Sequence, residues 1–163
     1  NMANKEKIVN TGKISAENIK ISSNDMENKE LTAVNADIDL TGNLKTGSIK
    51  AVENLSIKGK NIENTGTMAA NKKVKIESTN LSNKGDISAD EIKINNQNKI
   101  VNEKNITASI TEITSNSIDN NGKATGRILT LNTGKLINTN TIYGENQLKI
   151  NAVSIEIMVY KVI

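Results

Sequence analysis

Residues 62–76 read Ile62-Glu-Asn64-Thr-Gly66-Thr-Met68-Ala-Ala70-Asn-Lys-Lys-Val74-Lys-Ile76, and this order of residue types recurs along nearly the whole chain. Each unit opens on an aliphatic residue, which we call the opener. Openers are spaced 18 or 19 residues apart, at Ile8, Met26, Leu44, Ile62, Leu81, Ile100, Ile118, Leu136 and Ile155. Eight complete units therefore occupy residues 8–154, between a lead-in at 1–7 and an apolar tail at 155–163 that starts a ninth unit.

Alternation of residue types predicts the fold. Stretches of three to five residues with apolar side chains at every second position, rich in Ile, Val and Thr, indicate short β-strands. The unit is too short for a usual strand–helix pair or a four-stranded propeller blade. It fits one coil of three short strands, and such coils stack about 4.8 Å apart. The sequence therefore predicts an all-β parallel β-helix, or β-solenoid, of about eight coils.

Asparagine occupies a fixed place, two residues after the opener, in seven of the eight units. Stacked amides can donate to the coil on one side and accept from the coil on the other. We therefore predict a ladder, meaning a row of side chains from successive coils that are hydrogen-bonded to one another. Thr46 interrupts it, and we expect the second to fourth coils to be its weak point. The ladder residues are Asn10, Asn28, Asn64, Asn83, Asn102, Asn120 and Asn138.

Small residues mark a second column, in which every unit has Ala or Gly two places after its second aliphatic residue. We expect this column to lie where the wall of the coil approaches the opposite strand, so that a Leu there would overpack the interior. Glycine also recurs just after the Asn, at Gly12, Gly66, Gly85 and Gly122, which suggests a corner with positive φ. Asn140 is tolerable there, whereas Lys104 at the same position is not explained by this hypothesis.

Lysines gather on the predicted outer surface of the third to fifth coils. Between the two aliphatic residues that close each unit lie outward positions such as Lys20, Asp39, Lys75 and Lys93. A basic face could hold sulphated glycan or anionic lipid headgroups, although lysines on an outer strand face also discourage sideways aggregation, which is the interpretation we favour. The candidate anionic-glycan face consists of Lys58, Lys60, Lys72, Lys73, Lys75 and Lys93.

Composition argues against several classes of function. The chain has no Cys and no His, which excludes disulfides, thiolate chemistry, imidazole metal sites and His-dependent nucleophiles. Acidic residues do not recur at the spacing of a calcium-binding repeat, so we expect no metal and no cofactor. Arg127 is the single Arg, and Tyr143 and Tyr160 are the only rings. We therefore expect neither nucleic-acid binding nor catalysis.

The two ends carry separate expectations. Residues 1–7 lack the apolar core of a signal peptide, so we expect any export signal to lie outside this chain. The tail from Ile155 to Ile163 contains Glu156 and Lys161 and is about half of the roughly 20 residues that a membrane span needs. One hypothesis is that a single-base deletion in an A-run shifted the reading frame within the ninth unit. The alternative is an apolar cap that pairs with the last coil.

The repeated unit, aliphatic-x-Asn-x-Gly-x-Ile-x-Ala followed by Ile-x-Ile, resembles the repeats of filamentous haemagglutinins and related two-partner-secretion exoproteins, which include contact-dependent growth-inhibition effectors. The resemblance covers residues 8–154. It implies a right-handed parallel β-helix, export through an outer-membrane transporter partner, and a secreted location on the bacterial cell surface. It extends to the repeat shaft alone, because the chain has no recognisable secretion domain or toxin domain.

Three functions remain open at this point. The leading hypothesis is a structural shaft segment of a secreted, surface-exposed haemagglutinin-like adhesin or exoprotein. The alternatives are a module that binds a host glycan, matrix or receptor through the lysine face, and the stalk of a contact-dependent toxin-delivery effector. Because strand edges at the ends of a solenoid pair readily with other copies, we also expect self-association.

Overall fold

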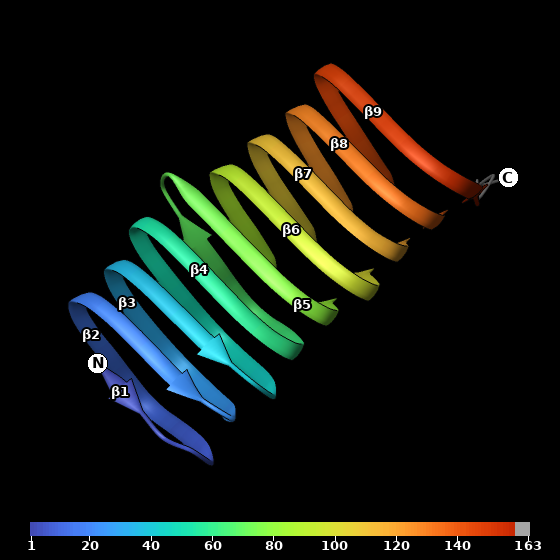
Figure 1. Ribbon diagram of the computed structural model, residues 1–163. Helices are drawn as coiled ribbons and strands as arrows, with labels where there is room; N and C mark the ends of the chain where they lie inside the picture. Colours follow the sequence, from blue (N-terminus) through green and yellow to red (C-terminus); the bar gives the residue numbers. More distant parts are fainter. Residues whose placement is uncertain (159–163) are drawn as a thin grey trace, which may run out of the picture.

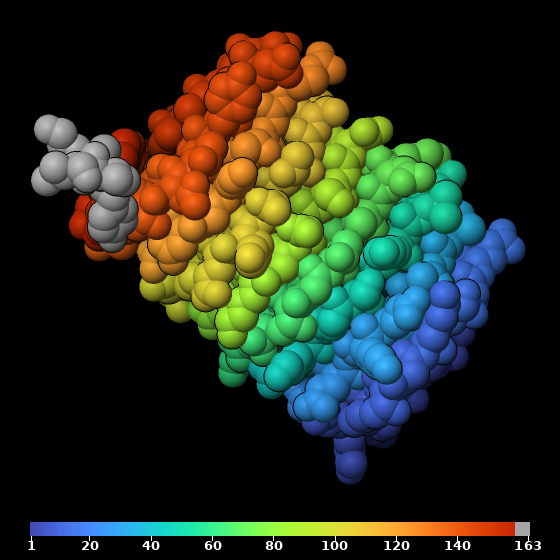
Figure 2. Space-filling model, turned by 180° about the vertical axis from the view of Figure 1, so that it is seen from behind, coloured from blue at the N-terminus to red at the C-terminus, as the bar shows by residue number. Residues whose placement is uncertain are grey.

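The chain folds as a parallel β-solenoid of about nine turns, which confirms the predicted fold. The computed structural model describes residues 1–158, and these contain strands and no helix. Figure 1 shows the coils stacked in chain order, with the two termini at opposite ends of the stack. Figure 2 shows the same coils as successive bands of colour along the rod.

Most strands bend around the corners and form an almost complete coil. Isoleucine, valine and threonine favour such an extended backbone, and the shortness of the polar corners keeps pairing nearly continuous. The strands are β1 (Met2–Ala3), β2 (Lys7–Ser23), β3 (Asp25–Leu40), β4 (Asn43–Ala70), β5 (Lys73–Asn83), β6 (Asp86–Asn102), β7 (Asn105–Asn120), β8 (Lys123–Asn138) and β9 (Thr141–Ile157).

Each coil pairs in parallel with the next, and equivalent positions of the repeat lie in register. Ile8 pairs with Met26 and Met26 pairs with Leu44, so the openers form one continuous column. β4 extends beyond one coil, and therefore both β5 and the start of β6 pair with it. The lead-in also joins the sheet, because Met2 in β1 pairs with Ile21. At the other end, Ile155 pairs with Leu136 on schedule for a ninth unit.

The core is a stack of aliphatic columns that run the length of the rod. From β3 to β8 the openers and the second aliphatic residues are buried. The core is more open in β9, where the closing residue Leu148 is 44% exposed and the opener Ile155 is 51% exposed. Each coil therefore relies on the next coil to cover its apolar side chains. The remainder of the predicted tail, residues 159–163, lies outside the described residues.

The closing pair of the second unit differs from the expected alignment. The aliphatic pattern selects Ile38 and Leu40, but the structure pairs Ile19 with Ala36 and Ile21 with Ile38. Asp37, and not Asp39, therefore lies beside Lys20 on the outer face. The sequence pattern missed this register because Ala36 is smaller than the aliphatic residues in the same column.

Glycine serves a different purpose from the one we expected. The prediction of positive φ at the corners is wrong, because no residue in 1–158 has a positive φ. A Cβ atom at Gly66 would instead overlap the carbonyl oxygen of Gly47, and one at Gly122 would overlap that of Lys104. The constraint is close approach to the preceding coil. Lys104 has a φ that any L-residue adopts, and the structure does not explain why a side chain is accepted at this corner.

The small-residue column is in register and lies at the edge of the core. Ala33, Ala51, Ala70 and Ala108 are buried, whereas Ala89 is half-buried. Ala108 pairs with Ala89 on one side and with Gly126 on the other. A larger side chain at Ala108 would therefore meet a neighbouring coil on both sides, as the overpacking argument requires.

Candidate functional site

The predicted asparagines form a buried hydrogen-bonded ladder at one corner of the coil. Asn64, Asn83, Asn102 and Asn120 each donate from Nδ2 to Oδ1 of the ladder residue in the following coil, over 2.7–2.8 Å. Each Nδ2 also donates to a backbone carbonyl of that coil, as from Asn102 to Lys123. The ladder therefore satisfies carbonyls that the corner would otherwise leave without a partner.

Thr46 divides this ladder in two. Asn10 donates to Asn28 over 2.8 Å, and Asn28 donates to the Thr46 hydroxyl over 2.9 Å. The described residues show no side-chain hydrogen bond from Thr46 to Asn64. Thr65 instead donates to the backbone carbonyl of Thr46. The predicted weak point thus corresponds to a missing link between two hydrogen-bonded runs.

A second buried polar row escaped the sequence analysis. Ser78, Asn96 and Ser115 lie at the next inward position after the closing pair. Asn96 donates to Ser78 over 2.9 Å and Ser115 donates to Asn96 over 2.8 Å. The signal was present in the sequence, because these residues all stand two places after a closing aliphatic residue. It was masked by the variety of the residue types in that column.

The lysines of the candidate glycan face are mostly paired with carboxylates. The pairs are Lys58–Asp39, Lys72–Glu53, Lys73–Glu91, Lys75–Glu77 and Lys93–Glu112, with nitrogen–oxygen distances from 2.6 to 3.6 Å. Of the six lysines, Lys60 alone has no ion pair among the described residues. The hydrogen bond from Lys75 lowers the pKa of Glu77 below its ordinary value. The face is therefore a lattice of compensated charges and presents little excess positive charge to an anionic glycan.

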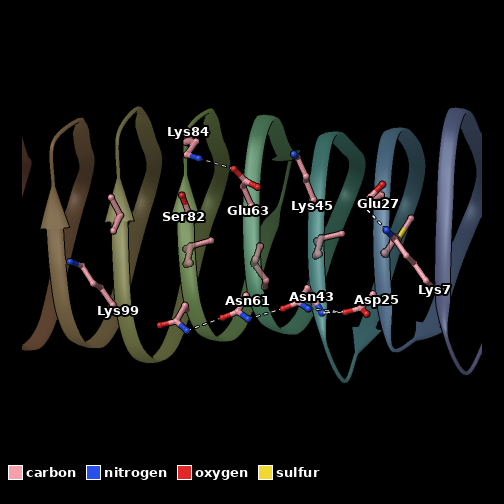
Figure 3. A pocket seen from close by; sticks show the side chains of 16 residues that line it. Lys7, Asp25, Glu27, Asn43, Lys45, Asn61, Glu63, Ser82, Lys84 and Lys99 are labelled. Carbon is pink, nitrogen blue, oxygen red and sulfur yellow. Dashed lines mark hydrogen bonds and ion pairs between the residues drawn. The ribbon is translucent and has the colours of Figure 1, made fainter.

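A groove runs along another face, across successive coils (Figure 3). One wall is a row of exposed amides, which sequence analysis did not single out. Asn61 donates to Asn43 over 2.7 Å and Asn80 donates to Asn61 over 2.8 Å; Asn98, which does not line the groove, donates to Asn80 over 2.9 Å. Asp25 ends the row by accepting from the Asn43 side chain. Asn43, Asn61 and Asn80 each precede an opener, which is the signal that could have revealed the row.

The opposite wall consists of charged side chains, of which Glu27, Lys45 and Glu63 directly follow openers. Lys7 pairs with Glu27 over 2.7 Å, and Lys84 pairs with Glu63 over 2.8 Å, as the dashed lines in Figure 3 show. These hydrogen bonds lower the pKa of both carboxyls and raise that of the Lys84 ammonium. Lys45 lies between the two pairs and has no ion pair among residues 1–158. The charges of this wall are thus largely compensated.

The groove is open and shallow, because both walls project from the same strands. Outward residues on either side of an opener are about 7 Å apart along a strand, whereas the openers point into the core. The width suits a single extended chain. Among residues 1–158 there is no cluster of three or more acidic side chains suited to a metal ion. Nor do these residues contain a helix of the length and apolarity that crossing a membrane requires.

Comparison with known proteins gives no relative for this chain. No family model, curated protein or solved structure matches it. Conclusions about function therefore depend on the geometry and on the repeat pattern.

Proposed function

We propose that this chain is a structural shaft segment of a secreted, surface-exposed bacterial exoprotein of the haemagglutinin-like kind. Its task is to provide length and rigidity and to hold other parts of a protein away from the cell. The same shaft would serve an adhesin or a toxin-delivery exoprotein, and an outer-membrane transporter would be its export partner.

One observation carries the proposal: a single uninterrupted core runs along the rod, braced by a buried amide ladder that is continuous from Asn64 to Asn120. Parallel pairing links every coil from β2 to β9. The ladder is buried at Asn64, Asn83, Asn102 and Asn120, where bending would separate amide groups that have no water to replace their partners. A rod of this kind resists bending and can be lengthened by adding coils. Rigidity and variable length are properties that a shaft requires.

Removing one coil in register tests the proposal. Deletion of residues 81–99 joins Asn80 to Ile100 and keeps the columns aligned, because Leu81 pairs with Ile100. We expect the variant to fold, to shorten the rod by about 4.8 Å, and to remain on the cell surface with adhesion or toxin delivery intact. The measurements are small-angle scattering on the purified chain and protease accessibility on intact cells of the producing bacterium.

A second deletion of the same length distinguishes the shaft hypothesis from the binding-module hypothesis. Deletion of residues 55–73 joins Asn54 to Val74, again in register because Leu55 pairs with Val74. It removes Lys58, Lys60, Lys72 and Lys73. If this deletion abolishes cell binding while deletion of 81–99 does not, the shaft proposal fails in favour of a binding module within residues 55–73, which carry part of the lysine face and Asn61 of the groove. An intracellular location for the chain would also refute the proposal.

A further inference from the structure

The groove of Figure 3 presents the same chemical groups once per coil. Asn43, Asn61 and Asn80 precede successive openers, and Asn61 and Asn80 are direct partners in the sheet. Because parallel strands are evenly spaced, the amides recur at intervals of about 4.8 Å. A ligand that makes the same contact with each amide must repeat at close to that distance.

The groove amides keep hydrogen-bond donors and acceptors that a ligand could use. Asn61 uses one hydrogen of Nδ2 on Asn43 and one lone pair of Oδ1 on Asn80. An Asn side chain has a second amide hydrogen and a second oxygen lone pair, and those of Asn61 have no protein partner among the described residues. The ladder holds the amides in one orientation. Little side-chain entropy would therefore be lost when they bind a ligand.

The charges of the groove argue for an uncharged ligand. Lys7, Lys84 and Lys99 are already paired with Glu27, Glu63 and Asp119 in neighbouring coils. A polyanion would have to compete with these carboxylates, and a polycation with the ammonium groups. Hydroxyl groups meet no such competition, because they both donate to amide oxygens and accept from amide hydrogens.

The distance between successive groove amides distinguishes among the remaining classes of linear polymer as possible ligands. An extended polypeptide advances about 3.3 Å per residue and would drift out of step with the amides. Single-stranded nucleic acid needs cations and stacking rings, and among residues 1–158 no ring lines this groove. An extended β-linked chain of six-membered sugar rings advances by nearly one coil spacing per ring. Successive rings turn over, but every ring carries hydroxyls that can meet an amide.

We propose that this groove binds a linear, uncharged, β-linked polysaccharide lengthwise, with one sugar ring per coil. The amides of Asn43, Asn61 and Asn80 bond to the hydroxyls of three consecutive rings. This site lies on a different face from the candidate anionic-glycan face, and it binds its ligand through uncharged groups. It gives the rod a ligand that the shaft function does not require.

Titration of the 163-residue chain with β-1,4-linked glucose oligomers of two to six units tests the proposal, with calorimetry and amide chemical shifts as readouts. Each net hydrogen bond contributes modestly, so we expect affinity to rise about two- to tenfold per added unit up to three units, one for each groove amide, and then to level off. The α-1,4-linked hexamer, whose chain curves, should bind far more weakly. Absence of binding, affinity independent of length, equal binding of the α-linked hexamer, or preference for a polyuronate would each overturn the proposal.

A pair of matched variants locates the site. Asn61→Ala removes the middle of the groove ladder and breaks two side-chain hydrogen bonds. Asn35→Ala does the same in the exposed ladder Asn18–Asn35–Asn54 on another face. We expect Asn61→Ala to weaken binding of the β-linked tetramer about tenfold and Asn35→Ala to leave it unchanged, with equal denaturant midpoints. Equal losses of affinity in the two variants would refute the assignment to this groove.

Discussion

Replacement of Asn102 by Ala measures what the buried ladder contributes to stability. Asn102 is 1% exposed, accepts from Asn83 over 2.8 Å, and donates to Asn120 over 2.7 Å and to the Lys123 carbonyl over 3.2 Å. The variant leaves one hydrogen of Asn83, one lone pair of Asn120 and one carbonyl without partners. Each buried unpaired group costs about 1–3 kcal/mol. Allowing for partial relaxation, we expect the free energy of unfolding to fall by about 3–5 kcal/mol.

The exposed ladder supplies the control. Asn61→Ala also breaks hydrogen bonds to two ladder neighbours, but water can replace them, so we expect a loss below about 1 kcal/mol. Urea unfolding followed by circular dichroism compares the two variants. Hydrogen exchange at the Asn83, Asn102 and Asn120 corners reports whether the loss is local, because repeat proteins can unfold in parts. Equal losses in both variants, or a loss below about 1 kcal/mol for Asn102→Ala, would refute the role assigned to the buried ladder.

Four further outcomes are expected. Thr111→Val should stabilise the fold by about 1–2 kcal/mol in urea unfolding, because the Thr111 hydroxyl is buried with no hydrogen-bond partner among residues 1–158; a loss of stability would contradict this. Ala108→Leu should lower the free energy of unfolding by about 1–3 kcal/mol, whereas Lys93→Leu on the outer face should change it little. Equal urea midpoints for the two variants would contradict the observed register of the coils. The pKa of Glu63 is lowered in the fold, so its carboxylate contributes fully to stability above its unfolded pKa of about 4.3 and this contribution is lost as pH falls through the lowered value. The urea midpoint should therefore decrease in acid, and Glu63→Gln should make this decrease smaller. The isolated polypeptide 1–163 should self-associate at high concentration through its strand edges, and a strictly monomeric species by light scattering at millimolar concentration would refute this.

Sequence alone was sufficient for the architecture, because the repeat places side chains of the same size at the same position of every coil. Ile62, Asn64 and Met68 belong to columns that any register other than the observed one would scatter. The finer register was ambiguous where a small residue replaced a large one, as at Ala36. In that unit Leu40 satisfied the same alternation two places later, and only pairing with the neighbouring coil distinguishes the two alignments.

The groove and the glycines could not be predicted because they depend on distances between coils. Asn43, Asn61 and Asn80 look like ordinary polar residues before an opener until stacking brings their amides together. Gly66 looks like a turn residue, whereas its constraint is the backbone of the preceding coil. The ion pairs of the lysine face were likewise hidden from the sequence, since Lys73 meets Glu91 only across two coils that are separate in the sequence.

The direction of the amide ladders bears on how long such a rod can become. At the buried corner each Asn donates toward the following coil, as Asn83 does to Asn102, whereas in the exposed rows each Asn donates toward the preceding coil, as Asn80 does to Asn61. Side-chain dipoles aligned in one sense would add up along the rod and leave partial charges at its ends, as peptide dipoles do in a helix. Opposed rows cancel much of this polarity, so the partial charge at the two ends stays small whatever the number of coils.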